Sequence, residues 1–217
     1  MRRPHIFFYL LLCLTPLALL AQAKLEKAPA LADTAVPALI RAAIEPSGAR
    51  IVRPDGSVLC EIWLRKSLPN GAAAANKGAA YPGLSESVLV GVISFPNGGS
   101  DFRGQAIKPG FYTMRYELLP EDGNHMGVAP TRDFALLLPA SADSDPSAKY
   151  DYGQMVKLSS QASGTNHPAA FLLLTPEGGE ERTYQNADGF QVYAGSIMTP
   201  DGKSAPIALV VKGRAEQ

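Results

Sequence analysis

Apolar and polar residues alternate with a period of two along most of the chain from Gly48 onward. Turn-forming groups, such as PDG at 54–56 and DG at 188–189, separate the alternating segments, which are rich in β-branched and aromatic residues. Such alternation is typical of strands that turn one face to a core, and DG pairs are typical of tight hairpins. The pattern predicts a mostly β protein built as an antiparallel β-sandwich. The predicted strands lie in ARIVR, SVLCEIWLRK, SVLVGVISF, GFYTMRYELL, RDFALLLP, AAFLLLTP, GFQVYAGSIM and PIALVVKG.

Two segments carry a helical period instead. The spacing i, i+3, i+4 and i+7 predicts one short helix over residues 36–44, packed against the sheet. Its core-facing residues are expected to be Val36, Leu39, Ile40 and Ala43. A second short helix is predicted over 153–162, with Asp151 or Tyr152 before it and Gly164 as its C-terminal stop.

The segment FYTMRYELL shows the two faces of one predicted strand. One row of alternate residues should face the core, and the opposite row, which carries the charges, is predicted to face solvent. The core-facing row is Tyr112, Met114, Tyr116 and Leu118, and the solvent-facing row is formed by Thr113, Arg115 and Glu117. Cys60, on an earlier strand, is predicted to be a small buried residue, because no basic group or second cysteine is close enough to make it reactive.

The first 23 residues have the pattern of a secretory signal. Arginines are followed by a short apolar run, which ends in the small-x-small sequence Ala21-Gln22-Ala23. The apolar run is short for a membrane span and contains Pro16. We therefore predict cleavage after Ala23, export to a bacterial periplasm or to the extracellular space, and no membrane span in the mature chain.

The mature chain has the length of one domain. Residues 24–34 are rich in Ala, Pro, Lys and Glu and are predicted to be a flexible leader, so that residues 35–217 form a single β-sandwich domain with a short N-terminal helix. The Ala/Gly-rich stretch at 68–83 is predicted to be a mobile surface loop.

The net charge of the chain and the absence of common catalytic motifs limit the classes of function that the sequence allows. Without Arg2 and Arg3, 20 basic residues become 18, against 20 acidic ones, and the net charge is −2. This near-neutral balance argues against nucleic acid as a partner. The chain lacks HExxH, CxxC, GxxxxGK and GxSxG, which favours a protein without catalytic activity. An enzyme would need His125 or His167 beside an acid in a pocket.

Residues 121–134, EDGNHMGVAPTRDF, gather most of the candidate chemistry. One interpretation is a structural hairpin loop, in which Asp122-Gly123 makes the turn, Asn124 and His125 bond backbone groups and Met126 packs on apolar surface. Polar groups of the same loop, with charges on neighbouring strands, could instead bind a ligand. Those candidate residues are Asp122, Asn124, His125, Arg115 and Asp133. The alternative is a metal site, because imidazole and thioether suit copper and oxygen ligands suit calcium. Its candidate ligands are Asp122, His125, Met126 and His167. No other cofactor is predicted.

Two further groups of side chains suggest surface functions. Charged residues around the same hairpin are predicted to form a solvated cross-strand network, namely Arg103, Arg115, Arg132, Asp101 and Asp133. Tyrosines could form a carbohydrate-stacking platform if their rings are exposed and coplanar. The candidates are Tyr81, Tyr150, Tyr152, Tyr184 and Tyr193.

The block DFRGQAIKPGFYTMRYELLPEDGNHMGVAPTRDFALLLP, residues 101–139, resembles a recurring block in uncharacterised secreted proteins of soil-type bacteria, and CEIWLRK and GTNHPAAFLLL look like further parts of that pattern. KPGFYTMRY is also similar to the PG-x-Y strand of transthyretin-like sandwich domains. The resemblance implies a secreted β-sandwich and no known activity. For the fold we expect an immunoglobulin-like, transthyretin-like or jelly-roll arrangement.

The sequence therefore predicts an exported, non-catalytic binding or interaction module with an unknown protein or glycan partner. The alternatives are a periplasmic metal-binding protein of copper type, and a carbohydrate-binding or unrecognised hydrolytic domain.

Overall fold

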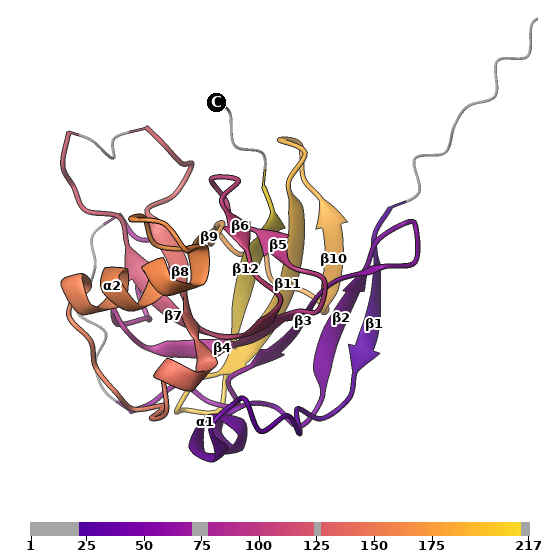
Figure 1. Ribbon diagram of the computed structural model, residues 1–217, viewed down its shortest axis with the longest axis horizontal. Coiled ribbons are helices and arrows are strands. Elements are labelled where there is room, and N and C mark those ends of the chain that lie inside the picture. The colour runs from indigo at the N-terminus through magenta and orange to yellow at the C-terminus, as the bar shows by residue number, and fades with distance from the viewer. Residues whose placement is uncertain (1–21, 71–77, 124–126, 214–217) are drawn as a thin grey trace, which may run out of the picture.

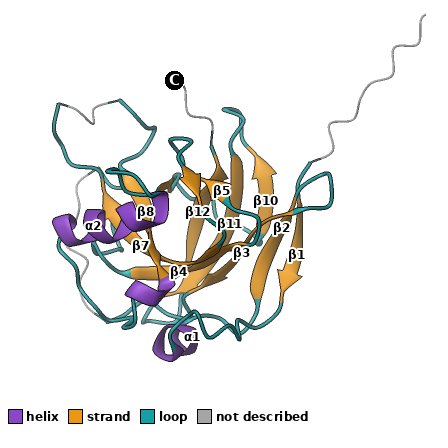
Figure 2. Cartoon of the chain, viewed as in Figure 1, coloured by secondary structure: helices purple, strands orange, loops and turns teal. Residues whose placement is uncertain are grey.

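The computed structural model describes residues 22–70, 78–123 and 127–213 (Figures 1 and 2). Its strands are β1 (Lys24–Ala28), β2 (Gly48–Val52), β3 (Val58–Leu64), β4 (Leu89–Phe95), β5 (Gly99–Ser100), β6 (Ala106–Ile107), β7 (Gly110–Leu118), β8 (Asp133–Pro139), β9 (Ala170–Leu172), β10 (Arg182–Gln185), β11 (Gln191–Met198) and β12 (Ser204–Lys212). Its helices are α1 (Ala38–Ala43), α2 (Tyr152–Ser163) and the 3-10 helix η1 (Ala140–Ala142).

The strands form two main sheets that pack around one core. The larger sheet is antiparallel, with strand order β1-β2-β3-β4-β7-β8-β9, and the smaller has the order β10-β11-β12. Met114 and Leu137 of the larger sheet lie in one buried cluster with Tyr193 and Leu209 of the smaller sheet. An antiparallel bridge between Leu173 and Leu209 joins the two sheets. This mostly β, sandwich-like architecture with two α-helices confirms the fold class that the alternation predicted.

The helices cover part of the outer face of the larger sheet (Figure 2). Trp63, Leu89 and Val92 form a buried cluster with residues of α1 and its flanks, and Met155 of α2 packs against Leu136 and Leu138 of β8. Strands β4, β7 and β8 are therefore buried on both faces. The prediction that the second row of β7 faces solvent is wrong, because that row lies under this outer layer.

The two predicted helices are present. α2 begins with a capping box between Asp151 and Gln154, so that Asp151 and not Tyr152 precedes the helix, and it ends at Gly164 in the left-handed conformation, as predicted. In α1, Ile40 is completely buried but Leu39 is 63% exposed. The expectation that Leu39 faces the core is wrong. In this helix of six residues, the side that carries Ile40 packs against the sheet, and Leu39 lies away from it.

The segment predicted to be a flexible leader contains β1, which pairs with β2 along its whole length. Further along, the Pro29 carbonyl accepts a hydrogen bond from Trp63 Nε1 at 2.9 Å. A Cβ atom at Gly48 would lie 2.7 Å from the Trp63 ring, so the indole can cross β2 only over a glycine. Long-range pairing thus orders a segment whose composition favoured a loop.

Two local expectations are confirmed. Gly56 and Gly189, which end the turn sequences at 54–56 and 188–189, have φ values of 83° and 80°, a conformation that glycine adopts without strain. Cys60 is completely buried on β3, and burial raises the pKa of its thiol. Among the residues that the structure describes, no helix is both long and apolar enough to cross a membrane.

Candidate functional site

The loop that gathers the candidate metal ligands is described only at its ends. Asn124, His125 and Met126 lie outside the described residues, while Asp122 and His167 are exposed. Within the described ranges, no group of three or more His, Cys, Asp or Glu side chains is arranged to hold a metal ion. The copper and calcium hypotheses therefore stay predictions.

Arg115, a predicted ligand-binding residue, is completely buried and forms an ion pair with the equally buried Asp143. The pair is bidentate: Nε lies 2.6 Å from Oδ2, and Nη2 lies 2.7 Å from Oδ1. The remaining guanidinium donors bond the carbonyl oxygens of Ser87, Ala148 and Asp145 at 2.7–2.9 Å. Every donor of Arg115 is thus used: four hold the chain that connects η1 to α2, and one holds Ser87 in the segment before β4.

Asp143 is saturated as well. Its Oδ2 accepts from Thr113 Oγ1 at 2.6 Å, and its Oδ1 accepts from Tyr150 Oη at 3.2 Å. The Tyr150 ring lies 4.9 Å from the Arg115 guanidinium carbon. A buried ion pair with all its lone pairs and donors satisfied is a structural element, and it leaves no group free for a ligand.

Asp133, also predicted to bind a ligand, is completely buried on the opposite face of the larger sheet. Its carboxylate accepts hydrogen bonds from Tyr116 Oη at 2.6 Å, from Ala80 N at 2.9 Å and from Tyr81 N at 3.1 Å. Asp133 therefore ties the end of the Ala/Gly-rich insert to the core. Tyr81 itself is only 7% exposed, so this end of the predicted mobile loop is anchored; residues 71–77 lie outside the described part.

The predicted charge network does not form. Arg115 pairs in register with Leu136, while Asp133 pairs with Leu118, so the two charged side chains point to opposite faces of the sheet. Asp101 accepts hydrogen bonds from the backbone N–H groups of Arg103 and Gln105. Arg132 instead binds Glu121 near the surface.

The five candidate tyrosines do not form one exposed platform. Tyr81 and Tyr193 are buried, and the hydroxyl of Tyr193 donates to Glu181 at 2.6 Å. Tyr150 covers the Arg115 guanidinium. Tyr152, at 46% exposed, and the half-buried Tyr184 lie on different elements.

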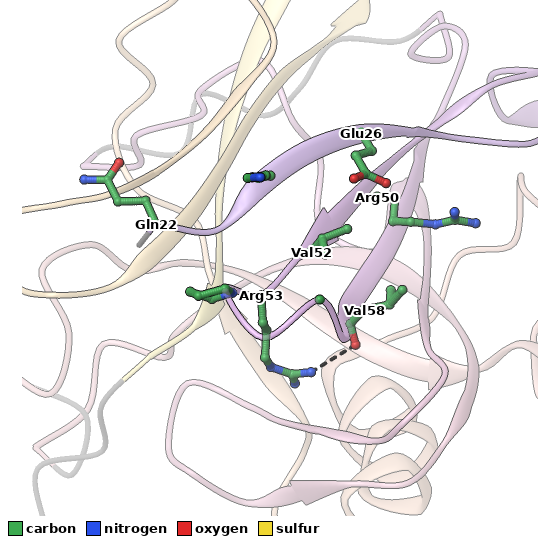
Figure 3. Close-up of a pocket in the computed structure, with 9 residues that line it drawn as sticks. Gln22, Glu26, Arg50, Val52, Arg53 and Val58 are labelled. Atoms are coloured by element: carbon green, nitrogen blue, oxygen red, sulfur yellow. Dashed lines mark hydrogen bonds between the residues drawn. The ribbon is translucent and has the colours of Figure 1, made fainter. Parts of the chain in front are cut away.

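A hollow of about 420 Å³ lies on the outer face of β1–β3, beside the turn at 53–57 (Figure 3). The strand register builds it, because Lys24 pairs with Val52 and Val52 pairs with Val58. These two valines supply apolar surface, and charged side chains surround them. The charged lining residues are Lys24, Glu26, Arg50 and Arg53, and Gln22, which also lines the hollow, precedes the predicted cleavage point.

The charged groups around the hollow differ in whether they already have hydrogen-bond or ion-pair partners. Arg50 donates from Nε and Nη2 to Glu61 Oε1, at 2.7 and 2.6 Å. Arg53 Nη1 donates to the Val58 carbonyl at 3.0 Å (Figure 3). Within the described ranges, the exposed Lys24 ammonium and Glu26 carboxylate have no hydrogen-bond or ion-pair partner. A cationic donor and an anionic acceptor are therefore free at one rim of the hollow.

Sequence reasoning missed this hollow. Its signal was the alternation in KLEKA, residues 24–28, which places Lys24 and Glu26 on one face of a strand. The composition of the same segment favours a loop.

Comparison of the chain with known protein families, curated proteins and solved structures finds no match. The resemblance of residues 101–139 to secreted bacterial proteins thus assigns no family to the chain.

Proposed function

We propose that the protein is an exported, non-catalytic binding module and that the hollow on β1–β3 is its ligand site. The observation that carries the proposal is the rim of free donors and acceptors, from Lys24 and Glu26, beside the apolar surface of Val52 and Val58. Binding sites for small polar ligands combine an apolar surface with a few convergent polar groups in this way.

The charges of the hollow favour a neutral polar ligand. The side-chain charges of Lys24, Arg50 and Arg53 are balanced by Glu26 and Glu61, and by Asp55 in the adjacent turn, so that after cleavage only the α-ammonium group of Lys24 is in excess. A polyanion would gain little from this balance, whereas the hydroxyl groups of a glycan can accept from Lys24 and donate to Glu26. The C–H face of a sugar ring would lie on the two valines. We therefore propose a neutral glycan as the ligand.

The binding proposal is tested by titrating isotopically labelled residues 24–217 with a panel of soluble neutral oligosaccharides and following amide chemical shifts. We expect shifts confined to β1, β2 and the 53–57 turn, and about a tenfold weaker affinity in a Lys24→Gln/Glu26→Gln double variant, because two charge-assisted hydrogen bonds are lost. Lys157→Gln, an exposed lysine on α2, is the matched control and should bind like the parent. Chemical-shift changes elsewhere, or equal affinity in the double variant, would exclude the hollow as the ligand site.

Export carries its own prediction. β1 begins at Lys24, so cleavage after Ala23 would leave the first strand complete. We expect the protein recovered from the periplasm or medium of an expressing bacterium to have Lys24 as its N-terminal residue, as measured by intact mass. An Ala21→Arg/Ala23→Arg variant should stay uncleaved, because the peptidase requires small residues there. A parent protein that keeps residues 1–23 would contradict export by a cleaved signal.

A further inference from the structure

Glu117 differs from the other buried acids of the described chain. It is 4% exposed on β7, and its carboxylate accepts one hydrogen bond, from its own neighbour Leu118 N at 3.0 Å. By contrast, Asp143 has a bidentate arginine, and Asp133 has three donors. A buried carboxylate with so few donors is poorly compensated for its lost hydration.

The groups around Glu117 do not supply the missing charge. Glu86 lies near it from the segment before β4. Tyr152 of α2 lies within electrostatic range of Glu117. Phe134 is its register partner on β8. Arg115, two residues along the same face, is fully engaged by Asp143 and by backbone carbonyls. Ionisation of Glu117 therefore places a negative charge near that of Glu86, and Arg115 is not available to compensate it.

Burial first, and then the nearby Glu86, raise the pKa of Glu117 to about 7, and the Leu118 N–H only partly opposes this shift. A folded-state pKa above the unfolded value means that the folded chain holds a proton that the unfolded chain has lost. The contribution of Glu117 to stability is fully present below pH 4.5 and is lost as the pH rises through about 7.

We propose that Glu117 makes the packing of this end of the molecule sensitive to pH. When its carboxyl group is neutral, the first turn of α2 and the chain after β7 pack on the sheet. When the carboxyl group is ionised, this packing is weakened. The ionised carboxylate gains hydration only if the layer above it opens, and the half-exposed Tyr152 at the start of α2 is the residue of that helix within electrostatic range of Glu117. α2 and β1 lie on opposite sides of the molecule (Figure 1), so the device does not depend on the hollow. In a protein exported as proposed above, it would couple this end of the sheet to the pH outside the cell.

The test is amide hydrogen exchange by mass spectrometry between pH 5.5 and 8.5, with rates corrected for the intrinsic pH dependence. With Glu117 titrating near 7 when packed and near 4.5 when open, protection of peptides covering 151–158 should fall roughly 30-fold across this range. Glu117→Gln keeps the shape and cannot ionise, so its protection should stay constant. Glu180→Gln, an exposed acid near β10, should behave like the parent.

A second variant keeps the test decisive if Glu117→Gln folds poorly. Glu86→Gln removes the exposed neighbour that disfavours ionisation, so the loss of protection should shift to lower pH. No fall in the parent, an equal fall in Glu117→Gln, or an unshifted transition in Glu86→Gln would each overturn the proposal.

Discussion

Replacing Arg115 with methionine is expected to lower the free energy of unfolding at pH 7 by about 3–5 kcal/mol, because Asp143 is then left as an unpaired buried charge. Asp143 is completely buried, and its remaining donors would be Thr113 and Tyr150, both neutral. Methionine fills much of the arginine volume, so the loss reports the charge and hydrogen bonds more than a cavity. Urea unfolding followed by circular dichroism measures the change.

The matched control is Arg132→Met. Arg132 is partly exposed and pairs with the exposed Glu121, and such surface pairs contribute about 0–1 kcal/mol. A second comparison, Arg115→Met/Asp143→Leu, removes both charges together and should recover much of the stability, because no unpaired charge stays buried. If Arg115 were a ligand-binding group on a solvated face, Arg115→Met would instead leave stability almost unchanged, and that result would refute the structural role.

Replacing Asp133 with alanine is expected to cost about 3 kcal/mol or more, because three donors lose their acceptor at once and each unsatisfied buried donor costs about 1–3 kcal/mol. Two of the donors are the backbone N–H groups of Ala80 and Tyr81. The same variant should therefore raise amide exchange in residues 78–84, where the insert is tied to the core. Thermal unfolding and hydrogen exchange measure the two effects.

Tyr116→Phe provides the graded control for Asp133. It removes one of the three donors, and it leaves the two backbone hydrogen bonds to the carboxylate in place. A loss of about 1 kcal/mol with unchanged exchange in 78–84 is expected. Equal losses in Tyr116→Phe and Asp133→Ala would show that Asp133 does not anchor the insert.

These residues show why the candidate site was only partly predictable. The sequence marked Arg115 and Asp133 as members of a solvated charge network or a ligand site, whereas both are completely buried. It could not pair them, because Arg115 meets Asp143, 28 residues later, across a connection with no periodic pattern. Since charged side chains on the two rows of a strand are equally able to face solvent, only the layer above the sheet decides which row is buried.

The hollow could not be predicted from the sequence for a related reason. Lys24 and Glu26 look like residues of a polar leader until β1 pairs with β2 and brings them beside Val52 and Val58. Edge-strand pairing depends on a partner 20 or more residues away, and local composition carries little information about it.

The sequence by itself determined the mostly β architecture, both α-helices with the cap residues of α2, the glycine turns and the burial of Cys60. Each of these follows from local physics: side-chain period, backbone conformation and helix capping act within a few residues. Only the tertiary structure decided which charges meet, that β7 is buried on both faces, that the leader begins with a strand, and where Glu117 lies. Those outcomes depend on which distant segments cover each face of the sheet, because the free energy of a buried polar group is set by the partners that the fold brings to it.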